Sequence, residues 1–241
     1  KPCTIIIKTE KEKKGILYAG TELGMYISVD DGNSWNSFQL NLPIVPITDL
    51  TIKENSLIVA TQGRSIWALD DLTVLHQIDQ NTVNKEINLF KPKTSYRTRG
   101  RGGKETLTEG TNLPNGVIVH FNVKNFSPDK DELSLHFKEQ DGTIIKTYKS
   151  NDENDKLEIK SGGNTFVWNT LYEGAEILDS MIFWSASFSG AKAVPGNYKV
   201  VLDFHHFFLE QITNNSPNIN ININPKGSIG PWWGGRHELS N

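Results

Sequence analysis

The stretch that decides the fold is Ser28-Val29-Asp30-Asp31-Gly32-Asn33-Ser34-Trp35. It predicts a tight turn, because the Asp30 carboxylate can accept hydrogen bonds from turn amides and Gly32 can adopt a positive φ. We expect the hydroxyl groups of Ser28 and Ser34 to add hydrogen bonds to the backbone, and Trp35 to bury its ring between sheets. These roles make Asp30 a structural residue rather than a catalytic one.

Short runs of β-type residues lie on both sides of this turn, and glycine, asparagine and aspartate separate them. Strands that are short, evenly spaced and joined by glycine-containing corners are typical of a sandwich, a barrel or a propeller. The expected strands cover residues 16–21, 25–29, 35–40, 47–52, 57–61 and 65–69.

An internal repeat distinguishes among these folds. Residues 16–27 align with residues 57–68, and each unit reads as strand, glycine-containing turn, strand. A recurrence after about 41 residues suits a propeller with one four-stranded sheet, or blade, in each repeat. Two blades cannot close a ring of the usual four to eight blades. We therefore expect residues 1–78 to be terminal blades, and the remaining blades to lie in upstream sequence or in another chain.

The rest of the chain predicts a second β domain. Residues 79–110 are polar and basic, and we interpret them as a linker. Asp141-Gly142 marks a hairpin turn. The alternation over residues 111–226 predicts an immunoglobulin-like sandwich, so the fold class is all-β, and residues 227–241 form a tail. The strands of the sandwich are expected at residues 117–123, 132–139, 144–148, 156–159, 164–168, 197–203 and 218–224.

Composition argues against several functional classes. The net charge of −3 does not favour nucleic acid, and we interpret the basic run at residues 96–104 as part of the linker. No run of 18 apolar residues predicts a membrane span, and no signal peptide opens the chain. A single cysteine, Cys3, excludes an internal disulfide, and His205-His206 lack the acidic or cysteine companions of a metal site. We expect neither a metal nor a cofactor.

The turn at residues 28–35 fits the Asp-box pattern, Ser/Thr-x-Asp-x-Gly-x-Ser/Thr-Trp, at every defined position. Together with residues 17–26, 40–43 and 59–67, it resembles the bacterial sortilin-like Asp-box (BNR) repeat proteins. These proteins are labelled glycosyl hydrolases by similarity to xyloglucanase and sialidase propellers. Phe90-Lys91-Pro92, Asn164-Thr165-Phe166-Val167-Trp168 and Ala193-Val194-Pro195-Gly196 match the linker and sandwich of such proteins. The resemblance covers roughly residues 14–203, and it departs at Gln62, where the family usually has histidine.

The resemblance implies a large secreted chain, found outside the cell, in the periplasm or on the cell surface. A glycosidase needs two carboxylates on either side of the sugar. The candidate carboxylates in the propeller part are Glu22, Asp49, Glu54, Asp70 and Asp71. Glu22, Asp70 and Asp71 lie at strand ends or turns, where carboxylates commonly cap the backbone or stay solvated. Because similar xyloglucanases also place their acid and base between two propellers, we expect no catalytic residue here.

The expected function is that of a non-catalytic structural or binding part of a secreted propeller protein, with a polysaccharide or protein ligand. Two alternatives are the C-terminal part of a polysaccharide-active glycoside hydrolase and a sortilin-like peptide-binding propeller. The possible binding residues are Arg64, Trp184, Trp232 and Trp233. Trp35, Trp67 and Trp168 fall within strand patterns, and we expect them in the core.

Overall fold

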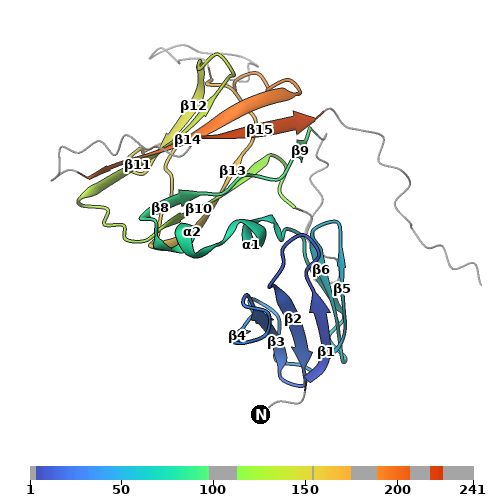
Figure 1. The fold of residues 1–241 in the computed structure, drawn as a ribbon. Coiled ribbons are helices and arrows are strands. Elements are labelled where there is room, and N and C mark those ends of the chain that lie inside the picture. The colour runs from blue at the N-terminus through green and yellow to red at the C-terminus, as the bar shows by residue number, and fades with distance from the viewer. Residues whose placement is uncertain (1–3, 98–112, 154, 175–188, 207–217, 225–241) are drawn as a thin grey trace, which may run out of the picture. The chain divides into compact units, whose positions relative to one another are not determined.

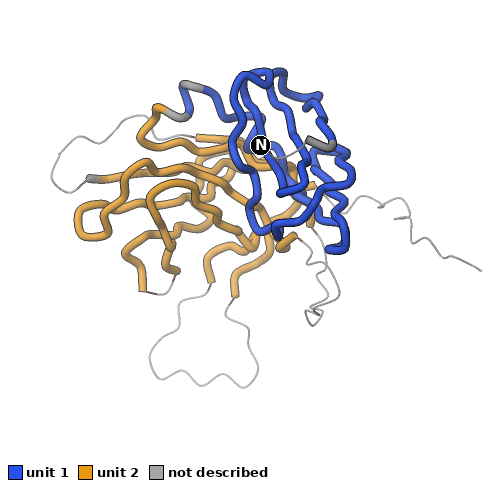
Figure 2. The backbone as a smooth tube through the Cα atoms, turned by 90° about the horizontal axis from the view of Figure 1, so that it is seen from below, with its two compact units in different colours: residues 1–83 blue, residues 84–241 orange. Residues whose placement is uncertain are grey.

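The computed structural model describes residues 4–97, 113–153, 155–174, 189–206 and 218–224. Strands dominate the described residues, which confirms the all-β prediction. The chain divides into two compact units, residues 1–83 and residues 84–241, which Figure 2 shows in blue and orange. No helix in the described part of the chain is long and apolar enough to cross a membrane.

The first unit contains two antiparallel sheets (Figure 1). The first sheet has four strands in chain order, β1 (Thr4–Thr9), β2 (Leu17–Thr21), β3 (Gly24–Ser28) and β4 (Asn36–Ser37). The second sheet has three, β5 (Ile47–Lys53), β6 (Ser56–Thr61) and β7 (Ile66–Leu69). Two short helices follow, α1 (Thr73–Gln77) and α2 (Gln80–Asn84).

One face of each sheet in the first unit contributes to a shared hydrophobic core. Successive side chains of a strand point to opposite faces, so every second residue of a strand faces this core. The buried residues are Ile16, Tyr18, Met25 and Ile27 around the first sheet, Ile47, Leu50, Leu57 and Val59 in the second, and Leu72 before α1. Gly20 of β2 lies where the sheets approach each other, close to Ile47 of β5.

The two sheets repeat one another in detail. The register of β1 against β2 shifts opposite Thr21, and the register of β5 against β6 shifts opposite Thr61. Thr21 pairs with Gly24, whereas the Thr61 amide donates to the Ser65 carbonyl at 3.3 Å. The second hairpin turn is therefore one residue longer than the first. The repeat spacing is 61 − 21 = 40 residues before the turn and 66 − 25 = 41 residues after it, which corrects the uniform 41-residue alignment.

Equivalent residues of the two sheets are buried to opposite extents. Met25 and Ile66 each directly follow the residue that closes the hairpin turn, Gly24 or Ser65, yet Met25 is 1% exposed and Ile66 is 70% exposed. The first sheet thus packs on the second sheet with the face that carries Met25. The equivalent face of the second sheet, which carries Ile66, is exposed. The two sheets therefore stack back to front.

The second unit is a sandwich of two sheets. One sheet has the order β13-β10-β8, and the other has the order β12-β11-β14-β15-β9. The first consists of β8 (Ile87–Leu89), β10 (Val117–Val123) and β13 (Gly162–Trp168). The second consists of β9 (Ser95–Tyr96), β11 (Asp131–Lys138), β12 (Ile144–Lys149), β14 (Gly196–His206) and β15 (Asn218–Asn224).

Aromatic side chains join the two sheets of the sandwich. Trp168 of β13 stacks on Phe137 of β11, with ring centroids 4.4 Å apart and planes inclined by 20°. Tyr198 of β14 meets the Trp168 ring edge-on at 5.9 Å. Trp168 is completely buried, as predicted, and it anchors a core that both sheets line.

Two predictions for the second half of the chain are wrong in detail. Residues 79–110 are not simply a linker, because this range contains all of α2, β8 and β9. Leu89 of β8 pairs with Phe121 and is buried, and Ser95 of β9 pairs in parallel with Ile223. Residues 156–159 form no strand and make only an isolated bridge, Lys149 with Lys156.

The predicted last strand is confirmed. β15 reads Asn-Ile-Asn-Ile-Asn-Ile-Asn, and Ile221 and Ile223 are both 1% exposed. It pairs with β14 along one edge and with β9 along the other. β14 pairs along residues 218–223, whereas β9 pairs only with Ile223 and Asn224, so the second edge is protected from further strand pairing only at that end.

Candidate functional site

The turn between β3 and β4 is held by Asp30 and its neighbours. The Ser34 amide and hydroxyl group donate to the two carboxylate oxygens of Asp30 at 2.8 and 2.6 Å. The Ser28 hydroxyl group donates to Asp30 Oδ1 at 2.8 Å and accepts from the Gly32 amide at 2.8 Å. Gly32 has φ +89°. Every polar atom of Asp30 is therefore engaged within the turn.

These hydrogen bonds favour the ionised form of Asp30. The donors on Ser34, followed by the Ser28 hydroxyl group, lower the pKa of the Asp30 carboxyl to about 2. The ordinary pKa applies in the unfolded chain, so protonation favours unfolding. The stabilisation is complete above about pH 4 and disappears as the pH falls towards 2.

We expect Asp30→Asn to lower the Tm at pH 6, and to lower it less as the pH falls towards 2. The measurement is the Tm of both proteins across this pH range by circular dichroism. Asp31→Asn is the matched control, because Asp31 is exposed with φ +58°, which asparagine tolerates. A Tm difference that stays constant with pH would contradict the role of the Asp30 charge.

Trp35 corrects one expectation for this turn. The ring is 37% exposed instead of buried, and its Nε1 donates to the Gly32 carbonyl at 3.1 Å. Trp67 makes the corresponding bond to the Arg64 carbonyl at 2.8 Å and is half-buried. Both indoles thus bond to the carbonyl three residues earlier, and this local bond holds each ring beside its own turn.

An open hollow lies between the two sheets of the first unit. Its volume is about 60 Å³, and Trp67 and Leu69 of β7 form one wall. The segment Phe38–Leu42, which follows β4, forms the opposite wall. Met25, Leu57 and Val59 form the base, and no charged side chain lines the hollow. The lining suits an apolar group.

Gln39 fixes the wall formed by the segment after β4. Its Oε1 accepts from the Met25 amide at 3.1 Å, and its Nε2 donates to the carbonyls of Leu42 and Pro43 at 2.9 and 2.8 Å. The bond to Met25 requires Gly24, since a Cβ atom there would lie 2.0 Å from Gln39 Oε1.

The five carboxylates considered for catalysis are spread over separate turns and strand positions. Asp71 Oδ1 accepts from the Thr73 amide and hydroxyl group at 2.9 and 2.6 Å, which holds the start of α1. Asp49 Oδ1 accepts from the Leu50 amide at 2.8 Å. Glu22 and Glu54 are exposed, and Asp70 is partly exposed.

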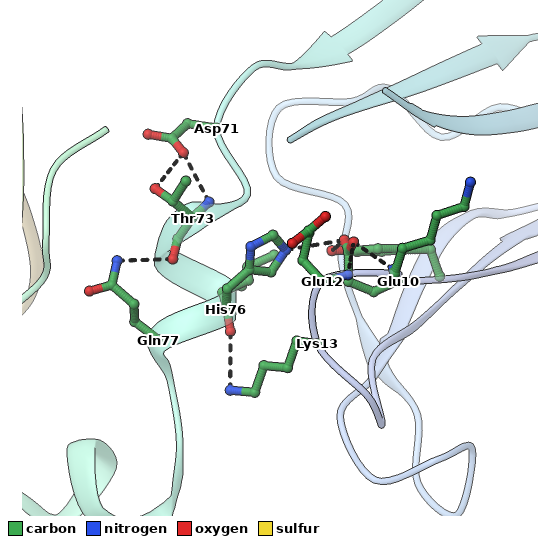
Figure 3. A network of polar contacts seen from close by, with 10 residues as sticks. Glu10, Glu12, Lys13, Asp71, Thr73, His76 and Gln77 are labelled. Atoms are coloured by element: carbon green, nitrogen blue, oxygen red, sulfur yellow. Dashed lines mark hydrogen bonds and ion pairs between the residues drawn. The ribbon is translucent and has the colours of Figure 1, made fainter. Parts of the chain in front are cut away.

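A buried carboxylate connects α1 to the turn between β1 and β2 (Figure 3). Glu10 is 3% exposed, and its Oε1 accepts from the amides of Lys11 and Glu12 at 2.8 and 3.3 Å. His76 Nε2 lies 3.3 Å from Glu10 Oε2, where it forms an ion pair when protonated, without hydrogen-bond alignment. Lys13 Nζ donates to the carbonyls of Leu75 and Ile78 at the end of α1.

Electrostatics in this network depend on Glu10. Burial raises the pKa of Glu10, but the two amides and His76 together outweigh it, so the pKa lies below its ordinary value. Burial and the nearby Glu10 carboxylate raise the pKa of the Tyr18 hydroxyl, which donates to Glu10 Oε2 at 3.4 Å. A charged Glu10 therefore stabilises the attachment of α1.

We expect Glu10→Gln to reduce the free energy of unfolding by about 1–3 kcal/mol, because an amide cannot satisfy all the donors around it. The measurement is urea denaturation followed by circular dichroism. Glu12→Gln, at an exposed position in the same turn, is the control and should change stability by less than about 0.5 kcal/mol. Equal effects of the two substitutions would contradict the role of Glu10.

The second unit carries a polar cluster on one sheet face. His136 Nδ1 lies 2.8 Å from Thr147 Oγ1, and His136 Nε2 lies 3.1 Å from Asp203 Oδ2. Burial lowers the pKa of His136, while Asp203 opposes this shift. Because these residues lie on the adjacent strands β12, β11 and β14, we interpret the cluster as cross-strand pairing that stabilises the sheet.

The predicted binding residues are only partly placed by the structure. Arg64 lies in the exposed turn between β6 and β7. Trp184, Trp232 and Trp233 lie outside the described residues. Among the residues that are described, no group of three or more histidine, cysteine, aspartate or glutamate side chains could hold a metal ion.

Comparisons with known proteins give a similarity to a solved structure and no family. No family model matches the chain, and no curated protein matches it. Among solved structures, it is similar to the extracellular domain of a hybrid two-component system from B. thetaiotaomicron, with 16% sequence identity and a TM-score of 0.29. The match covers 91% of this chain and 26% of that chain, so the chain spans about a quarter of its structural neighbour.

Proposed function

We propose that residues 1–83 are two consecutive blades of an Asp-box β-propeller, followed by an immunoglobulin-like sandwich. In this proposal, the chain is the C-terminal, non-catalytic part of a secreted bacterial protein, and it supports the propeller and binds a glycan or protein ligand. The observation that carries the proposal is the back-to-front stacking of the two sheets.

Back-to-front stacking supports a longer series, because the contact joins two different faces. Such a contact leaves one face open at each end, and the series then continues or closes into a ring. The open face of the second sheet carries Ile66, which is 70% exposed. The open face of the first sheet carries Ile7, which is 52% exposed, and Tyr26, which is half-buried.

The sequence of β2 also supports neighbours on both faces. The run Ile16-Leu17-Tyr18-Ala19-Gly20 is apolar without alternation. Strands covered on one face alternate between apolar and polar residues, whereas strands buried on both faces read as continuous apolar runs. Tyr18 faces the shared core, and Leu17 and Ala19 face the open side of the first sheet. The first sheet is therefore suited to packing on both faces.

The hydrogen bonds and the burial of the carboxylate side chains in the first unit support a non-catalytic role. Asp30, Asp49 and Asp71 accept hydrogen bonds from their own turns and strands. Glu10 is buried beneath α1. Each of these groups has a local structural function that accounts for its position.

Adding a charge to the open face tests the stacking. Ile66→Lys should change the stability of the 241-residue chain by less than about 0.5 kcal/mol, because the side chain is exposed. In a longer gene product that completes the ring, the same lysine would be buried in the next interface and should lower the Tm by several degrees. Leu23→Lys, at an exposed turn position, is the control and should be neutral in both proteins. Neutrality of Ile66→Lys in the longer product would contradict the proposal.

Activity is tested with the full-length secreted protein on xyloglucan and other β-glucans. We expect no release of reducing ends, with binding measured separately by calorimetry. Turnover that is abolished by replacing one pair of carboxylates would overturn the non-catalytic role and assign a glycoside hydrolase. Binding of peptides, with no effect of any glycan, would instead favour a sortilin-like peptide binder.

A further inference from the structure

Among the described residues, no strand pairs with the edge of β7 that lies opposite β6. We propose that this edge binds an extended, uncharged polypeptide segment from a partner chain, added antiparallel to β7 as a fourth strand. The inference rests on the repeat within residues 1–83, and it holds whether or not the sheets close into a ring.

The first sheet shows how such a strand is held. Tyr26 and Ile27 of β3 pair with Ser37 and Asn36 of β4. Beyond β4, the Phe38 amide donates to the Met25 carbonyl at 2.9 Å, and the Phe38 ring lies 6.0 Å from the Tyr18 ring. In the first sheet, a segment of the same chain therefore covers the edge of the third strand.

The second sheet lacks this segment because the chain turns away. After Leu69, the chain enters α1 instead of turning back to β7, and Asp71 Oδ1 accepts from the Thr73 amide at the start of this helix. The 41-residue spacing after the turn places Gln77, the last residue of α1, and Ile78 at the positions that correspond to β4. The chain thus repeats the first three strands and stops short of the fourth.

The edge of β7 has its backbone groups available. A backbone hydrogen bond joins Thr61 and Ser65. Hydrogen-bonded and non-hydrogen-bonded residue pairs alternate along two antiparallel strands, so the next hydrogen-bonded pair between β6 and β7 is Val59 with Trp67. The amides and carbonyls of Ile66 and Ala68 therefore point away from β6. Natural edge strands are commonly protected by charged residues, and Ile66-Trp67-Ala68-Leu69 contains none.

The hollow defines the chemistry of the added strand. In the first sheet, Ser37 of β4 pairs with Tyr26 of β3, and Tyr26 corresponds to Trp67 of β7. The residue of the added strand that corresponds to Ser37 would therefore lie beside Trp67. Its side chain would face the hollow, whose lining is uncharged and formed by Phe38, Leu42, Trp67 and Leu69 among others. An apolar side chain at this position matches the lining, and a charged one would be buried without a partner.

The test uses the 241-residue chain and a synthetic peptide with the sequence of residues 34–43 carrying Ser37→Leu. We expect saturable binding by calorimetry, and slower hydrogen exchange at the amides of Ile66 and Ala68 by NMR. The unmodified peptide should bind about tenfold more weakly, because serine leaves the hollow empty. A peptide that also carries Phe38→Pro should not bind, because it lacks the amide that would bond the Ile66 carbonyl.

Ala68→Pro in the protein is the matched variant. The Ala68 amide points to the free edge, so proline removes no hydrogen bond to β6 and should leave the circular dichroism spectrum unchanged. We expect it to weaken peptide binding at least about tenfold. The proposal would be overturned by no saturable binding of the Ser37→Leu peptide up to about millimolar concentration, or by equal binding of the Phe38→Pro peptide. The comparison of the peptides with and without Phe38→Pro uses the unaltered protein, so it tests the proposal even where Ala68→Pro fails to fold.

Discussion

Trp168→Ala is expected to reduce the free energy of unfolding of the sandwich by about 3–5 kcal/mol. The ring is completely buried and stacks on Phe137 at 4.4 Å, so its removal leaves a cavity between the two sheets. The substitution also removes the donor that bonds the Leu171 carbonyl at 3.2 Å. The measurement is guanidinium denaturation followed by hydrogen exchange of the β10 and β11 amides, which report on the second unit separately.

Trp168→Phe separates packing from hydrogen bonding. Phenylalanine retains most of the contact with Phe137 and Tyr198 but has no donor for Leu171. We expect a smaller loss, about 1–2 kcal/mol, from the unsatisfied carbonyl and the missing ring volume. Should both substitutions cost the same, stacking across the sheets would not be the dominant contribution of this residue.

Gly20→Val is expected to disrupt the contact between the two sheets of the first unit. A Cβ atom at Gly20 would lie 2.6 Å from Ile47 Cγ2 and 2.9 Å from Ile6 Cγ2, closer than carbon atoms pack. Because Ile47 is fully buried, it has little room to move, and we expect a loss of at least about 1–3 kcal/mol. The measurement is the urea midpoint of the first unit, reported by hydrogen exchange of the β2 and β6 amides.

The control for this substitution is Gly163→Val in β13. A Cβ atom at Gly163 would meet nothing within 4 Å, and valine favours strands. We expect no loss of stability there. A small effect of Gly20→Val, similar to that of Gly163→Val, would show that β2 and β5 do not pack as closely as the structure indicates.

The sequence predicts those strands whose pattern depends on burial of one face. In β10, Val117, Val119, Phe121 and Val123 are buried and the residues between them are partly exposed, so a period of two identifies the strand. The same reasoning predicts β15 at the residues the structure shows. In these strands each buried position requires an apolar residue, so the alternation of apolar and polar residues in the sequence shows which face is buried.

Strands that depend on distant partners are not predictable in this way. β8 has three residues and β9 has two, so neither contains enough alternation to define a period. Each becomes a strand only through pairing, β8 with β10 and β9 with β15. The basic, glycine-rich composition that follows β9 indicated a linker and concealed both strands.

The hydrogen bonds of the turn at residues 28–35 were predictable from the sequence, whereas the exposure of Trp35 was not. The spacing of serine, aspartate and glycine determines which atoms meet, because all these atoms lie within one turn. The burial of Trp35 depends on what lies beyond the turn, and its Nε1 bonds a local carbonyl. Gln39 and Glu10 carried no signal, since a single polar residue does not reveal the distant backbone it contacts.

A structure of the full-length gene product, by crystallography or cryo-electron microscopy, tests the central claim most directly. We expect a further β-sheet on the face that carries Ile66 and another on the face that carries Ile7, with all sheets around one axis. A first unit that stands alone, with both of these faces in solvent and no further sheets, would contradict it.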